Sequence, residues 1–197
     1  MNEKILKAIE ELRKGNFIII HDSYERENEC DFVKAAEFIN PEDIVRMRKD
    51  GGGMICIAIS KEIGEKLKLP FFSDIRDFAS EKFEILKYVK DNDLKYDKKS
   101  AFSLFINSRD TFTGITDYDR ALTIKKFVEV AKNFDEDIEK NIKIFSENFR
   151  TPGHVPILIS RGIENRKGHT ELSTEILKIA GLFPVAVICE ILDEDTF

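Results

Sequence analysis

The sequence has no tryptophan and only three cysteines, Cys30, Cys56 and Cys189, which lie far apart along the 197 residues. Thiols that are odd in number and unclustered do not build a disulfide framework, so we expect the protein in the reducing cytoplasm. No run approaches the roughly 20 apolar residues of a membrane helix. The amphipathic N-terminus also lacks the pattern of a signal peptide. These absences argue against a disulfide-rich secreted module and against a membrane protein.

Basic residues are in the minority, with 31 Lys and Arg against 37 Asp and Glu and a net charge of -6. A general nucleic-acid binder is normally basic, so we expect no nucleic-acid partner. A local cluster of arginines can still bind a small anion. Hydrophobic residues make up 42% and charged residues 35% of the chain. That composition is typical of a globular protein with a buried core and excludes wholesale disorder.

Internal repeats, low-complexity segments and Pro/Ser-rich linkers are also missing, which predicts one domain over residues 1–197. Apolar spacing and capping residues predict helices over 2–14, 40–51, 60–70, 119–132, 135–149 and 170–180. Apolar or alternating runs predict strands over 17–20, 32–38, 54–59, 102–107, 155–160 and 185–191, while 71–96 receives no assignment. Because helices and strands interleave, we predict an α+β fold with α/β-type layers, a single domain with a mixed β-sheet flanked by helices.

An acidic segment, residues 22–31, follows the first predicted strand and holds five carboxylates and one arginine. Loops beyond strand ends are common ligand sites in α/β proteins. Glu27, Glu29 and Asp31 are spaced by two, so an extended backbone would point them to one side. Crowded carboxylates repel one another unless a cation neutralises them, which favours a hard divalent metal. The alternative is a solvated acidic loop without a ligand.

A second group of polar residues, 166–170, stands directly before the last predicted helix and reads Arg-Lys-Gly-His-Thr. Basic side chains, a glycine and a helix N-terminus together favour an anion, and phosphate is the obvious one. His169 could be a metal ligand or an acid–base group. The alternative is a basic loop in which Thr170 only caps the helix.

Two further residues could do acid–base chemistry. His154 ends a stiff Arg-Thr-Pro-Gly-His turn before a strand, where it could serve as a general base or be an ordinary turn residue. Glu190 ends an apolar strand and needs a cation or hydrogen-bond donors, either in a site or in a structural ion pair. His21, the remaining histidine, is expected at a half-buried strand end. Together these features indicate an enzyme that acts on a small sugar phosphate.

Five motifs, in this order, resemble those of the 3,4-dihydroxy-2-butanone 4-phosphate synthase family of riboflavin biosynthesis. They read DSYERENECD at 22–31, FTGITDYDRA at 112–121, RTPGHV at 150–155, RKGHTE at 166–171 and VICEI at 187–191. The resemblance covers nearly the whole chain and implies a lyase that converts D-ribulose 5-phosphate to L-3,4-dihydroxy-2-butanone 4-phosphate and formate. It also implies a Mg²⁺ or Mn²⁺ cofactor and a homodimer. Without a GTP cyclohydrolase II domain, the chain would be the monofunctional form.

The resemblance further implies roles for single residues. Glu27 and His169 would bind the metal, and His154 and Glu190 would be essential for catalysis. The substrate would be bound by residues of three motifs, namely Arg26, Glu27, Asp31, Arg166, Lys167, Gly168, His169, Thr170 and Glu190. Asp22 and Glu29 would support them through hydrogen bonds or metal-bound water.

Two alternatives remain open from the sequence. The first is a non-catalytic relative that binds a sugar phosphate or a metal without turnover. The second is an unrelated metal-dependent phosphohydrolase. The phosphohydrolase would release inorganic phosphate, whereas the synthase keeps the phosphate on its product and releases formate.

Overall fold

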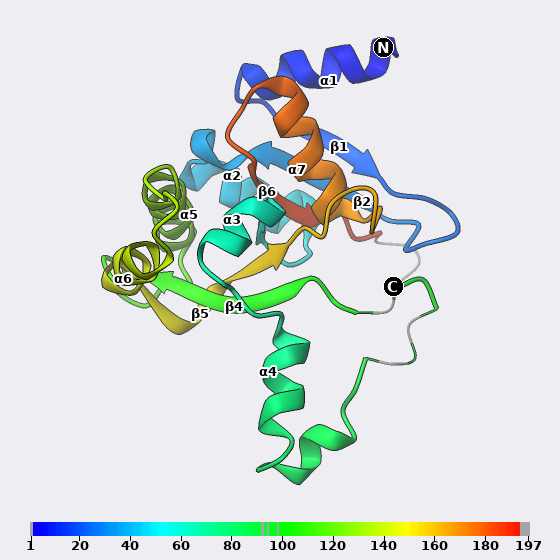
Figure 1. Cartoon of the computed structure of the whole chain (residues 1–197). Coiled ribbons are helices and arrows are strands. Elements are labelled where there is room, and N and C mark those ends of the chain that lie inside the picture. Colours follow the sequence, from blue (N-terminus) through cyan, green and yellow to red (C-terminus); the bar gives the residue numbers. More distant parts are fainter. Residues whose placement is uncertain (1, 92, 94, 98, 194–197) are drawn as a thin grey trace.

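A mixed sheet of six strands forms the centre of the computed structural model, which describes residues 2–91, 93, 95–97 and 99–193 (Figure 1). The strand order is β1-β2-β6-β3-β5-β4. The strands are β1 (Ile18–His21), β2 (Cys30–Ala35), β3 (Cys56–Ile59), β4 (Phe102–Ser108), β5 (Phe149–Ile159) and β6 (Val185–Glu190). Strands β3 and β5 pair in parallel, and the other four neighbouring pairs are antiparallel.

Helices cover both faces of this sheet. They are α1 (Glu3–Arg13), α2 (Pro41–Arg46), α3 (Lys61–Lys66), α4 (Phe72–Ala79), α5 (Asp117–Ala131), α6 (Ile138–Asn148) and α7 (His169–Ala180). Short helical turns are η1 (Ala36–Phe38), η2 (Met47–Gly51) and η3 (Glu84–Lys87). The longest helix, α5, has 15 residues, and none of the described helices is long and apolar enough to cross a bilayer.

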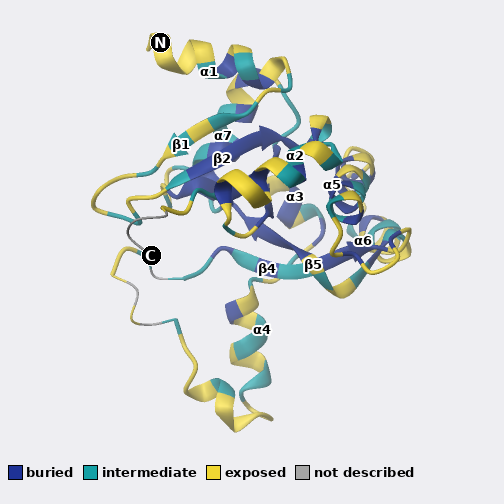
Figure 2. Ribbon diagram, turned by 180° about the vertical axis from the view of Figure 1, so that it is seen from behind, coloured by how far each residue is buried: buried dark blue, intermediate teal, exposed yellow. Residues whose placement is uncertain are grey.

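The buried apolar side chains form two cores, one on each face of the sheet. Figure 2 shows the ribbon of the central strands coloured as buried. One core includes Ile44 of α2 and Phe127 of α5, and the other includes Leu12 of α1 and Leu177 of α7. Side chains alternate along a strand, so neighbouring residues of the central strands enter opposite cores. Burial on both faces explains why β3 and β6 read as apolar runs in the sequence.

The fold class expected from the sequence is confirmed, and most elements lie within a few residues of their expected positions. Asn40 caps α2, because its side chain accepts a hydrogen bond from the Asp43 backbone N–H and the Asp43 carboxylate accepts one from the Asn40 N–H. Residues 36–38 form the turn η1 instead of continuing β2. The segment without an assignment contains α4 and η3, which project away from the sheet (Figure 1).

The main error concerns β5, which begins at Phe149 and not near residue 155. Arg150 through His154 therefore lie within a strand, and the expected turn at this place is wrong. The physical reason is long-range pairing, since Phe149 and Arg150 pair with Ser108 and Asn107 of β4. The helix expected over 135–149 ends at Asn148 for the same reason.

Candidate active site

The acidic loop between β1 and β2 is organised by Asp22. Its carboxylate accepts hydrogen bonds from the backbone N–H groups of Glu27 (3.0 Å) and Glu29 (3.2 Å) and from the Arg26 guanidinium (3.0 Å). Burial opposes ionisation of this carboxyl, but the hydrogen bonds outweigh it and lower the pKa of Asp22 to about 2. The loop is not extended, because Glu27 lies in a turn and Asn28 has φ +56°. The extended backbone on which the alternation depended is therefore not found, but Glu27, Glu29 and Asp31 still line one cavity.

A possible metal-binding group combines this loop with the first residue of α7. Asp22, Glu27 and His169 each offer a ligand atom, and these atoms lie within 4.8 Å of one another. The Nδ1 atom of His169 is 3.4 Å from Glu27 Oε2 and 3.6 Å from Asp31 Oδ1. Its Nε2 atom lies 3.2 Å from the Glu29 carbonyl oxygen, which can only accept a hydrogen bond. Nε2 therefore carries a proton, and Nδ1 of the neutral ring is available to a metal.

Electrostatics at this place favour a cation. Burial opposes a charged imidazolium, but the nearby carboxylates of Glu27 and Asp31 outweigh it and raise the pKa of His169. Burial, with the carboxylates of Glu190 and Glu27 nearby, raises the pKa of Asp31 from 3.8 to about 7. Asp31 Oδ1 is also a buried oxygen without a hydrogen-bond partner among the described residues. Carboxylates with one imidazole are donors that suit a hard divalent cation, so the residues present fit Mg²⁺ or Mn²⁺.

Glu190 lies on the same wall, because β6 ends where β2 begins and Asp31 pairs with Glu190 across the two strands. Its Oε2 atom accepts a hydrogen bond of 2.7 Å from the Met54 backbone N–H. The cavity of about 260 Å³ there is lined by residues of several loops and strands, including Glu27, Asp31, His169, Thr170 and Glu190. The structure therefore brings most of the expected site residues together, and it gives Glu190 a backbone donor.

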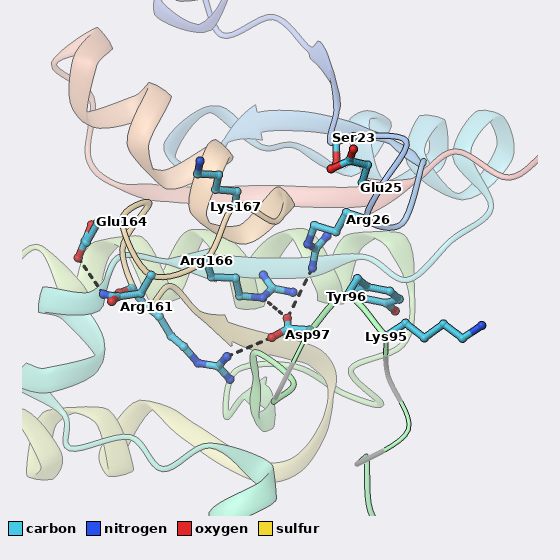
Figure 3. A pocket seen from close by; sticks show the side chains of 11 residues that line it. Ser23, Glu25, Arg26, Lys95, Tyr96, Asp97, Arg161, Glu164, Arg166 and Lys167 are labelled. Carbon is cyan, nitrogen blue, oxygen red and sulfur yellow. Dashed lines mark hydrogen bonds and ion pairs between the residues drawn. The ribbon is translucent and has the colours of Figure 1, made fainter.

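A second cavity, of about 640 Å³, lies next to the first and is rich in basic side chains (Figure 3). Its lining includes Arg26, Arg161, Arg166 and Lys167. Arg166 lines both cavities, so anion-binding and metal-binding groups share a wall. Gly168 is the N-cap of α7, and a Cβ there would lie 2.3 Å from Arg166 Nη1. Because Gly168 holds the N-cap position, the idea that Thr170 only caps the helix is wrong.

Asp97 occupies the middle of this basic cavity (Figure 3). Its side chain is only 9% exposed and accepts a hydrogen bond from Arg166 Nε. Guanidinium nitrogens of Arg161 and Arg26 lie 3.5 Å and 3.6 Å from its two oxygens. The Nη2 atom of Arg26 is buried and has no hydrogen-bond partner among the described residues. The Asp97 carboxylate therefore lies where converging arginines would otherwise bind a phosphate.

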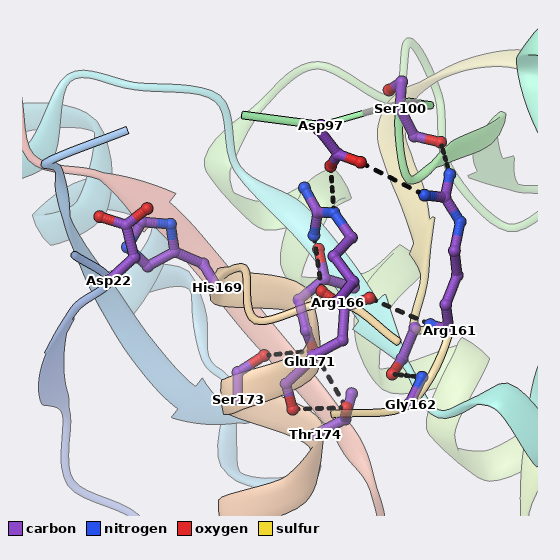
Figure 4. Close-up of polar contacts among 12 residues, drawn as sticks. Asp22, Asp97, Ser100, Arg161, Gly162, Arg166, His169, Glu171, Ser173 and Thr174 are labelled. Atoms are coloured by element: carbon purple, nitrogen blue, oxygen red, sulfur yellow. Dashed lines mark hydrogen bonds and ion pairs between the residues drawn. The ribbon is translucent and has the colours of Figure 1, made fainter. Parts of the chain in front are cut away.

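Arg166 is held between two carboxylates (Figure 4). Its Nη1 atom donates to Glu171 Oε2 at 2.6 Å, and the other oxygen of Glu171 accepts from the Arg161 backbone N–H at 3.0 Å. Burial opposes the charged guanidinium, but Glu171 and Asp97 outweigh it and raise the pKa of Arg166. Asp97 and Arg161 were missed from the sequence. The one sequence signal for Arg161 is its position directly after the strand predicted over 155–160, and Asp97 has no such signal.

We expect Asp97→Asn to tighten the binding of inorganic phosphate about fivefold, because a like charge worth about 1 kcal/mol leaves the anion cavity. The asparagine keeps the size of the side chain and removes only its charge. Calorimetric titration with phosphate measures the effect. Asp93→Asn, which removes a charge from an exposed position of the same segment, is the matched control. If the Asp97 variant binds phosphate no more tightly than the unchanged protein, the Asp97 carboxylate does not compete with phosphate for the arginines.

Protonation of the Asp31 carboxyl is expected to make the stability of the folded protein depend on pH. Its raised pKa means that the folded protein binds this proton more tightly than the unfolded chain. Between about pH 4 and about pH 7 the folded state holds more protons, so stability falls as the pH rises through this window. Asp31→Asn removes this penalty and is expected to raise the melting temperature at about pH 8 more than at about pH 5. Thermal melts in EDTA at both pH values test this, and equal shifts at both would refute it.

His154 is not brought to either cavity. It lies exposed in β5, and it lines neither of the two cavities described above. Its ring contacts Asn107 of β4. His21 is also placed differently from the expectation. It is exposed because β1 is an edge strand, and its Nε2 atom lies 3.0 Å from Asn28 Oδ1.

Comparisons with known proteins agree with this geometry. The family model of 3,4-dihydroxy-2-butanone 4-phosphate synthase matches residues 6–197. The 3,4-dihydroxy-2-butanone 4-phosphate synthase of Methanosarcina mazei is 46% identical over 99% of this chain and 79% of its own length. That of Archaeoglobus fulgidus is 44% identical over 96% of this chain and 80% of its own length. A solved 3,4-dihydroxy-2-butanone 4-phosphate synthase in complex with two magnesium ions has a TM-score of 0.74 and 29% identity, covering 98% of this chain and 77% of that one. The chain therefore belongs to the 3,4-dihydroxy-2-butanone 4-phosphate synthase family, as its five motifs indicated.

Proposed function

We propose that this chain converts D-ribulose 5-phosphate to L-3,4-dihydroxy-2-butanone 4-phosphate and formate, a reaction of riboflavin biosynthesis. One observation carries the proposal: the carboxylate–imidazole group and the arginine-lined cavity share the wall formed by Arg166. A phosphorylated ketose needs both, since its phosphate is an anion and its reacting oxygens gain negative charge. Membership of the family supports the same reaction.

Glu27 and His169 would hold the divalent cation, Mg²⁺ or Mn²⁺, with Asp22 beside them. When bound, the ion supplies positive charge for the oxygens that become negative during enolisation, skeletal rearrangement and loss of formate. A related solved structure contains two magnesium ions.

The remaining residues of the site bind and orient the substrate. Arg26, Arg166, Lys167, Gly168 and Thr170 would hold its phosphate end, which does not react, so that binding energy there orients the reacting end. Asp31 would contact substrate hydroxyls. Its pKa of about 7 also suits it to exchange a proton near neutral pH. Glu190 is fixed by the Met54 N–H and would exchange a proton at the cavity wall.

We further propose a homodimer, because His154 lies outside both cavities and a second copy can bring its own His154 to them. Exposed apolar side chains occur on the segment that follows β4, where Phe112 is 94% exposed. Ile115 and Tyr118 of the same segment are exposed as well. Such a surface next to the strand pair that carries His154 supports contact with another copy.

The three cysteines are free thiols in the structure, which supports a reducing compartment. We therefore place the enzyme in the cytoplasm. Its partner in this proposal is the small sugar phosphate, with no role for nucleic acid or a membrane.

The test is to incubate the purified protein with ribulose 5-phosphate and Mg²⁺ and to measure formate and inorganic phosphate, with and without EDTA. Formate that depends on the metal, without phosphate release, is the expected result. Phosphate release in place of formate would indicate a phosphohydrolase. Binding of ribulose 5-phosphate without either product would indicate a non-catalytic relative.

A further inference from the structure

Asn107 of β4 contacts His154 of β5 through both atoms of its side-chain amide. Its Oδ1 atom accepts a hydrogen bond of 2.8 Å from the His154 backbone N–H. Its Nδ2 atom lies 3.1 Å from His154 Nδ1 and 3.3 Å from the Thr113 carbonyl oxygen. Asn107 is only 3% exposed, so water does not replace these contacts.

The orientation of this amide follows from two main-chain groups. The His154 backbone N–H can only donate, so the amide atom facing it must be the oxygen. The Thr113 carbonyl can only accept, so the atom facing it must be the nitrogen. The same nitrogen faces His154 Nδ1, and as a donor it requires a lone pair on that ring atom.

We propose that Asn107 is a positioning residue that keeps Nδ1 of His154 free of a proton, so that the neutral ring carries its proton on Nε2. His154 then presents an N–H donor to the substrate. It acts as a neutral hydrogen-bond donor to an oxygen that gains negative charge, as neutral imidazoles do elsewhere. This inference rests on the proposed function, because it concerns the role of His154 in that reaction.

Two glycines from separate motifs make this contact possible. A Cβ at Gly114 would lie 2.0 Å from Asn107 Nδ2, and a Cβ at Gly153 would lie 2.0 Å from the Ile106 carbonyl carbon. The backbone of Gly114 also has φ +90°, a value that residues other than glycine rarely adopt. The pairing register between β4 and β5 shifts at Ile106 and Asn107. The motifs at 112–121 and 150–155 thus both build the Asn107–His154 pair.

The test compares Asn107→Asp with the unchanged protein. Aspartate keeps an acceptor for the His154 backbone N–H but replaces the donor at Nδ1 by a second acceptor, which attracts the ring proton. Nitrogen-15 NMR of the histidine rings, at a pH where they are neutral, reports which nitrogen is protonated, with exposed His21 as an internal reference. We expect Nε2–H in the unchanged protein and Nδ1–H in the variant. We also expect kcat for formate production to fall about 100-fold, with KM changed less than about threefold.

Asn107→Ala separates positioning from a structural role, because it removes all three contacts of the amide. A proton on Nδ1 in the unchanged protein would overturn the proposal, even if no variant folds. An Asn107→Asp variant that loses kcat as Asn107→Ala does, with its ring tautomer unchanged, would also overturn it. If the unchanged protein makes no formate, the proposed function fails, while its ring spectrum still decides the tautomer.

Discussion

Glu27→Gln is expected to weaken Mn²⁺ binding by about 100-fold or more and to reduce formate production close to background. Loss of an indirect, outer partner of a metal site already costs about 10-fold to 100-fold in affinity or activity, and Glu27 is one of three side chains whose ligand atoms lie within 4.8 Å. Glutamine keeps the shape of the side chain but removes its charge. The change also removes the ion pair of 2.5 Å with Arg26, so the arginine loses one of the groups that orient it.

Calorimetric titration with Mn²⁺ measures the affinity, and a thermal melt confirms that the variant folds. Glu136→Gln is the matched control, because its carboxylate is 95% exposed on the loop before α6, and it should leave Mn²⁺ affinity unchanged. Mn²⁺ affinity equal to that of the unchanged protein would remove Glu27 from the ligand set. A loss of turnover at normal affinity would assign it to substrate binding instead.

Much of the fold could be predicted because β3 and β6 are buried on both faces and therefore read as apolar runs. The helices were predictable for related reasons, since α1 buries one apolar face and both α1 and α7 end near a glycine. What failed was β5, where Pro152 and Gly153 indicated a turn. Pairing with β4 overrides that local preference, and no local pattern reports a partner about 40 residues away.

The candidate site was likewise predicted only in part. Glu27, His169 and Glu190 were expected from motifs, and the structure places them on one cavity. Asp97 and Asn107 were not expected, because each acts through contacts with residues distant in sequence. Neither residue stands in a pattern that indicates its partner.

His154→Ala is expected to lower kcat by about 100-fold to 10,000-fold, the usual contribution of a positioned imidazole. The affinity for ribulose 5-phosphate should stay within about threefold, because the oxygen to which His154 would donate gains its negative charge only during the reaction. His154→Gln supplies an N–H donor without a base and should recover part of the lost kcat if the ring acts as a donor. A His154→Ala variant with normal kcat would remove the residue from the mechanism, and a glutamine variant as inactive as alanine would favour a base.

The same variant tests where His154 acts. Consider a mixed dimer in which one chain carries His154→Ala and the other carries Glu190→Gln. If His154 completes the site of a second copy, one of the two sites in this dimer contains an unchanged His154 and an unchanged Glu190. Subunits mixed and re-associated in equal amounts form hybrids in half of the dimers, so about a quarter of the activity should return. If each chain used its own His154, both sites of every hybrid would lack one group, and mixing would restore nothing. Recovery on mixing therefore distinguishes a composite site from one in which His154 serves its own chain.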